Sequence, residues 1–99
     1  MAEQTVVSID LLRALCVSLL DHLQSVEGSE VRLDKDYYWS IPVEQRYDVY
    51  NPPTDLTIGQ LSECLTNLEQ LRDDPSQTTS YALVWLADLM RAVGEAVVR

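Results

Sequence analysis

The sequence predicts an α+β fold that is mainly helical, with a short irregular β-insert after the first helix. Apolar residues recur at helical spacing in three stretches, about residues 8–27, 57–72 and 78–98. Five of the seven aromatic residues lie between the first two of these stretches. A chain of 99 residues fits one domain. We therefore expect a single domain, residues 1–99, with a three-helix core in which a helical hairpin packs on the first helix and the third helix is central.

The first expected helix covers about residues 8–27. Ser8 is a suitable N-cap, and Asp10 lies in the first turn, where the helix dipole favours an acid. Gly28 follows the last turn and can adopt the left-handed conformation of a helix C-cap. The polar strip between the apolar positions is narrow, which predicts that most of this helix is covered.

The insert, about residues 30–53, begins with two stretches typical of short strands. Residues 30–33 alternate between polar and apolar side chains, and residues 37–41 are rich in strand-forming residues up to Pro42. A polar turn, residues 34–36, separates them. The two stretches should therefore pair as a small hairpin.

The rest of the insert is less regular. Residues 43–46 fit either a turn of helix or a loop. Residues 47–50 alternate again and predict a third short strand, which the following Asn51 and two prolines should end.

The second and third helices follow the insert. Thr57 and Gln60 fit a capping box, so the second helix should begin at about residue 57 and end at about residue 72. Its narrow apolar stripe is typical of a helix on the outside of a domain. The third helix, about residues 78–98, is apolar on most of its circumference and carries Trp85 near its middle, which should be buried. Its interior charges form one strip, consisting of Asp88, Arg91 and Glu95.

Sixteen acidic residues against seven basic ones give a formal net charge of −9. An acidic surface repels nucleic-acid phosphate and anionic membranes, and it attracts basic proteins. The simpler alternative is that the charge keeps the protein soluble. Cys16 and Cys64 both lie in apolar helical stripes without basic neighbours, which predicts reduced and unreactive thiols. Without a signal peptide or an apolar span, we expect a cytoplasmic protein.

No residue pattern fits a catalytic, metal or cofactor site. Ser18 and His22 are spaced to touch on one helix face, but a serine on a regular helix lacks oxyanion donors. The sequence of residues 34–36 begins like a calcium loop, although Trp39 occupies the position that requires glycine. We therefore expect no enzymatic activity, no metal and no cofactor.

The aromatic residues of the insert have two interpretations. Tyrosine, tryptophan and arginine are enriched at binding hot spots, which makes this segment a candidate for partner binding. Alternatively, the aromatic rings cover the core over the third helix, and we expect this for Trp39, with at least two tyrosines reaching the surface. The candidate partner-binding residues are Tyr37, Tyr38, Trp39, Arg46, Tyr47 and Tyr50.

The function that the sequence favours is a non-enzymatic protein–protein interaction module. We expect a small acidic subunit, adaptor or immunity-type inhibitor of a larger bacterial protein with a basic rim. Surplus apolar surface on the third helix also makes a homodimer through that helix possible, although two chains of charge −9 repel each other. The alternatives are an acidic mimic of nucleic acid that blocks a DNA- or RNA-binding protein, and a small enzyme or ligand-binding subunit.

Overall fold

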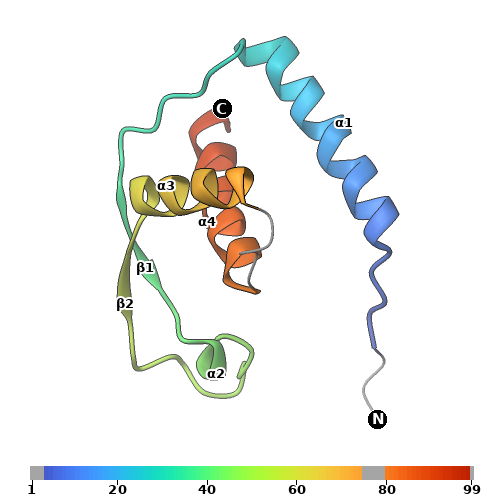
Figure 1. Cartoon of the computed structure of the whole chain (residues 1–99). Helices are drawn as coiled ribbons and strands as arrows, with labels where there is room; N and C mark the ends of the chain where they lie inside the picture. The colour runs from blue at the N-terminus through green and yellow to red at the C-terminus, as the bar shows by residue number, and fades with distance from the viewer. Residues whose placement is uncertain (1–3, 75–79, 99) are drawn as a thin grey trace. The chain divides into compact units, whose positions relative to one another are not determined.

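The computed structural model describes residues 4–74 and 80–98. It confirms a mainly helical fold with a small antiparallel β-sheet (Figure 1). The elements follow in the order α1 (Ile9–Glu27), β1 (Tyr37–Ser40), α2 (Val43–Arg46), β2 (Thr57–Gln60), α3 (Leu61–Asp73) and α4 (Ser80–Val97). The chain divides into an N-terminal unit, Met1–Val31, and a C-terminal unit, Arg32–Arg99, which are described separately. Within the described ranges, no helix is long and apolar enough to cross a membrane.

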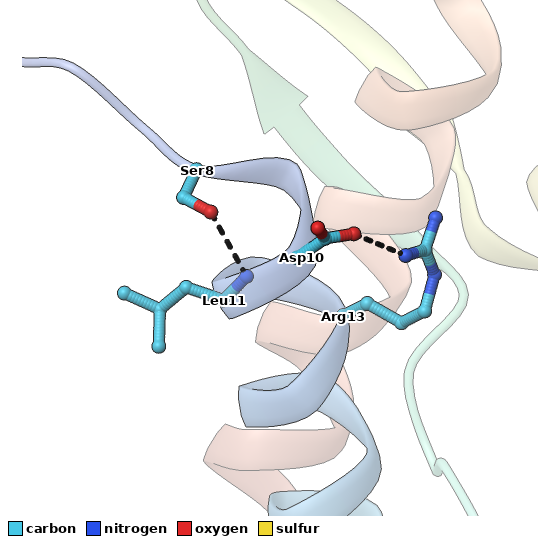
Figure 2. Close-up of polar contacts among 4 residues, drawn as sticks. All are labelled: Ser8, Asp10, Leu11 and Arg13. Atoms are coloured by element: carbon cyan, nitrogen blue, oxygen red, sulfur yellow. Dashed lines mark hydrogen bonds and ion pairs between the residues drawn. The ribbon is translucent and has the colours of Figure 1, made fainter.

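Helix α1 begins and ends as its sequence predicts. The Ser8 hydroxyl oxygen accepts a hydrogen bond from the backbone N–H of Leu11 at 3.2 Å, and the Asp10 carboxylate pairs with the Arg13 guanidinium at 2.9 Å (Figure 2). Gly28 has a positive φ of 88° and donates its N–H to the carbonyl oxygen of Gln24. Within its own unit α1 has nothing to cover its apolar residues, and none of them is buried.

The predicted hairpin between residues 30–33 and 37–41 is wrong. Strand β1 pairs instead with β2, in an antiparallel register that places Tyr38 opposite Gly59 and Trp39 opposite Ile58. Residues 30–33 form no strand. The strand partner therefore lies beyond the predicted insert, in the segment assigned to the start of the second helix.

Residues 47–50 form a turn rather than the predicted third strand. The Asp48 carboxylate accepts hydrogen bonds from the backbone N–H of Tyr50 at 3.2 Å and from the side-chain amide of Asn51 at 3.0 Å. These bonds, led by the one from Asn51, lower the pKa of Asp48. An aspartate that binds the backbone two residues on stabilises a turn, and here it outweighs the alternation of the sequence. Residues 43–46 adopt the helical turn, α2.

Helix α3 begins at Leu61, four residues after the predicted capping box. Thr57 lies in β2, where its hydroxyl donates to the carbonyl oxygen of Ser40 at 3.4 Å, and the N-cap residue Gln60 makes no side-chain capping bond. The cap comes from Asp36, which precedes β1. Its carboxylate accepts hydrogen bonds from the backbone N–H of Ser62 at 2.8 Å and the Ser62 hydroxyl at 2.9 Å, and its carbonyl oxygen accepts from the Leu61 N–H at 2.7 Å.

We expect Asp36→Ala to lower the melting temperature by several degrees, because the backbone N–H and the hydroxyl of Ser62, in the first turn of α3, lose their carboxylate acceptor. Hydrogen bonds from Gln60 and then Ser62 lower the pKa of Asp36 below its usual 3.8. A lowered folded-state pKa stabilises the protein fully above pH 3.8, and this contribution is lost as the pH falls through the folded pKa. The stability of Asp36→Ala, followed by circular dichroism, should therefore fall less than that of the unchanged protein as the pH is lowered. The matched control is Asp34→Ala, and an equal effect of both variants would contradict the capping role.

The core of the C-terminal unit lies where α3 packs on α4, which cross in Figure 1. Among the described residues its buried apolar members are Leu61, Cys64 and Ala82. Trp85 is only half-buried, and its ring stacks on that of Tyr81 with centroids 6.4 Å apart, so the predicted deep burial of Trp85 is wrong. Both cysteine thiols are free, with Cys64 buried and Cys16 half-buried. Helix α4 matches the predicted third helix, whose first residues, 78–79, lie outside the described part.

Candidate functional site

The two-stranded sheet, hereafter the ribbon, has two chemically different faces. Successive residues of a strand point to opposite faces, and residues opposite each other across two strands share a face. Tyr37, Trp39, Ile58 and Gln60 therefore lie on the outer face, and Tyr38 lies on the inner face with Gly59. Burial follows the same alternation, since Tyr37 and Trp39 are exposed whereas Tyr38 is half-buried.

The inner face anchors the ribbon to both helices of the hairpin through Tyr38. Its hydroxyl donates a hydrogen bond to the Asp88 carboxylate of α4 at 2.8 Å and lies 3.5 Å from the Cys64 sulfur of α3. Desolvation by burial, followed by the bonds to Cys64 and Asp88, raises the pKa of Tyr38 well above its usual value of 10.0. The phenol therefore keeps its proton and acts as a structural donor rather than as a base. Because that proton points to Asp88, the Cys64 thiol is the donor in the other bond.

Gly59 makes room for this anchor. A methyl group at position 59 would overlap the Tyr38 ring and lie 2.5 Å from its hydroxyl oxygen. The ring thus occupies the space that a side chain on the opposite strand would take. Glycine in a strand often marks such a close approach.

We expect Gly59→Ala to destabilise the protein by about 1–3 kcal/mol, the usual cost of an overpacked site. The matched control is Gly94→Ala in α4, where an added Cβ meets nothing within 4 Å. Because alanine has a higher helix propensity than glycine, Gly94→Ala should be more stable than the unchanged protein by about 0.5–1 kcal/mol. Urea unfolding of the two variants would measure these opposite signs. A neutral Gly59→Ala would show that the Tyr38 ring does not need the space.

The outer face of the ribbon carries large apolar side chains that nothing in the C-terminal unit covers. Tyr37 and Trp39 are each 68% exposed and Ile58 is 67% exposed. The expectation that Trp39 covers the core is therefore wrong, because its neighbour Tyr38 takes the inward position of the strand. Tyr37, Trp39 and Ile58 are hereafter called the ribbon face.

Backbone pairing brings Trp39 and Ile58 close together. Asp36 and Leu61 lie opposite each other, one position beyond the pair of Tyr37 and Gln60. Asp36 and Leu61 form a hydrogen-bonded pair, since the N–H of Leu61 donates to the carbonyl oxygen of Asp36. Hydrogen-bonded and non-hydrogen-bonded pairs alternate along an antiparallel ladder, so Trp39 and Ile58 form a non-hydrogen-bonded pair, the kind with the closer side chains. The ribbon face is thus a contiguous apolar surface on a fixed backbone.

The other candidate residues lie around α2, at the end of the ribbon away from α3 (Figure 1). Tyr47 and Tyr50 are exposed, as expected of at least two tyrosines, whereas Arg46 is half-buried and donates to the carbonyl oxygen of Ile41 at 3.3 Å. Gln45, which was not a candidate, fixes this loop by accepting from the Thr54 N–H at 2.8 Å and donating to the Asp55 carboxylate at 2.7 Å. The structure therefore divides the six candidates between the two faces of the ribbon and the α2 loop.

Two pockets border the ribbon. One, of about 340 Å³, lies between β1 and α4 and has both Arg91 and Glu95 in its lining. The other, of about 280 Å³, is lined by Trp85 and Glu63, neither of which the sequence identified as a candidate site residue. In the described part of the chain, no three histidine, cysteine or carboxylate side chains come together as metal ligands.

Comparisons with protein-family models, with curated proteins and with solved structures give no match for this chain. The site therefore has to be interpreted from its own geometry. That geometry consists of an anchored ribbon, an exposed apolar face and two adjoining pockets.

Proposed function

We propose that this protein is a non-enzymatic interaction module that binds a larger protein with a basic rim through the ribbon face. The observation that carries the proposal is the two-thirds exposure of Tyr37, Trp39 and Ile58 together on one face. Isolated large apolar side chains are common on protein surfaces, but a contiguous group that includes tryptophan and tyrosine is typical of a binding hot spot.

Rigidity of the ribbon supports this interpretation. The bond from Tyr38 to Asp88 and the Asp36 cap fix β1 to the helices, and β2 is held by its pairing with β1 and by its direct continuation into α3. A pre-organised surface loses little conformational freedom on binding, so more of its contact energy appears as affinity. An exposed aromatic face on a fixed backbone therefore suits a docking surface better than a mobile loop would.

Charge supports the choice of a basic partner. The chain has a net charge of −9, and the acids outnumber the bases in the C-terminal unit as well. Complementary charge around an apolar centre accelerates association and excludes acidic competitors. With two free thiols, we place the protein in the reducing cytoplasm as an adaptor or small subunit.

Affinity purification at two salt concentrations tests the proposal. The full chain, immobilised at low salt, should retain a basic protein that is released progressively as the salt concentration rises. Apolar docking alone would instead give retention that does not weaken with salt. Retention of acidic proteins, or of none from the source cell, would contradict the proposed partner class.

A further inference from the structure

We propose that the pocket containing Trp85 and Glu63 binds an organic cation, namely the ammonium or guanidinium group of a lysine or arginine side chain. The inference rests on the proposed function, because such a side chain would come from the basic partner. The pocket has a volume of about 280 Å³. It lies within the C-terminal unit, beside the ribbon, and is formed by both strands, α3 and α4.

Three of the nine residues that line this pocket are aromatic. Tyr37 and Tyr38 of β1 and Trp85 of α4 all line it, so the pocket borders the ribbon face at Tyr37. The electron-rich face of an aromatic ring attracts a cation, most strongly in tryptophan, and clusters of such rings recognise ammonium groups. Three rings around one pocket therefore favour a cationic ligand over an anionic one.

The lining of this pocket also includes one negatively charged side chain, that of Glu63. Glu63 is its only ionisable acid or base, apart from the Cys64 thiol and the tyrosines. The Glu63 side chain is exposed and makes no hydrogen bond or ion pair with any other described residue. A carboxylate beside aromatic rings complements a cation and repels an anion, and Asn67 adds a polar group to the same wall.

Neighbouring contacts hold the rings in place before a ligand arrives. The Tyr38 hydroxyl is fixed by Asp88 at 2.8 Å, and Trp85 stacks on Tyr81. The side-chain amide of Gln60 lies 3.5 Å from the Tyr37 hydroxyl. Pre-organised contacts of this kind lower the cost of binding a flexible basic side chain.

Nuclear magnetic resonance titration tests the inference, because the two tryptophans of the chain give two indole N–H signals. The probes are N-acetyl-arginine methylamide, N-acetyl-trimethyllysine methylamide and the neutral N-acetyl-norleucine methylamide. A cation should shift the Trp85 signal saturably and leave Trp39, which does not line this pocket, nearly unchanged. The two cationic probes distinguish a guanidinium ligand from an ammonium ligand.

Glu63→Gln should weaken binding of the cationic probe by about two- to fivefold, as expected for an exposed ion pair. Glu69→Gln removes the same charge from α3 outside the pocket and should leave binding unchanged. Equal shifts with the neutral probe, equal shifts of both tryptophans, or equal effects of the two variants would overturn the inference. A negative titration while the full chain still retains a basic protein would reject this pocket and leave the proposed function standing.

Discussion

Replacing Leu61 by alanine should lower the free energy of unfolding by about 2–4 kcal/mol, the usual cost of truncating a buried leucine. Leu61 is 7% exposed and is the largest of the three residues in the described core. It also begins α3 directly after β2, so its side chain packs where the ribbon joins the helices. For a domain of this size the change should lower the melting temperature by roughly 10–20 °C, measured by circular dichroism.

Leu65→Ala on the same helix is the matched control. Leu65 is 48% exposed, so its truncation removes less buried surface and should cost much less. Similar melting temperatures for the two variants would show that α3 does not pack through Leu61.

Trp39→Ala should weaken binding of the basic partner by about 30-fold or more while leaving the melting temperature almost unchanged. Truncating a hot-spot tryptophan typically costs about 2 kcal/mol or more of binding free energy. The side chain is 68% exposed, so the folded protein loses little when it is removed. Surface plasmon resonance with the purified partner would measure the change in affinity.

Leu83→Ala is the control that distinguishes specific binding through the ribbon face from non-specific hydrophobic binding. Leu83 is 71% exposed on α4 and lies outside the ribbon. Its truncation should leave the affinity unchanged. An equal loss in both variants would favour the contact through the third helix, which the sequence also allowed.

Helices that carry their own caps could be predicted from the sequence. Ser8 and Gly28 bound α1 as expected, because each acts on residues within four positions of itself. The start of α3 could not be predicted, since its cap is Asp36, which lies 26 residues before Ser62 along the chain. A local capping box at Thr57 fits the same residues equally well until the distant acceptor is known. That α1 packs on the helical hairpin stays a prediction.

The sequence could predict some residues of the candidate site, but not which of them face the core and which face outward. Clustering of aromatic residues identified Tyr37 and Trp39, but alternation within four residues cannot show which side of a strand meets the core. That choice depends on Tyr38, whose hydroxyl reaches Asp88, a residue 50 positions later. The one usable signal was Gly59, since a glycine among strand-forming residues indicates a close approach. Trp85 and Glu63 carry no such signal and meet only through the tertiary fold.

Site-specific photo-cross-linking tests the central claim, that the ribbon face binds a basic protein, most directly. A benzophenone amino acid at position 39 keeps an aromatic group on the ribbon face, and the same group at position 70 labels the exposed polar face of α3. We predict that position 39 cross-links to a basic protein, that excess unmodified chain suppresses the product, and that position 70 gives none. Cross-linking of the same protein from both positions, or from position 70 alone, would contradict the assignment of the ribbon face.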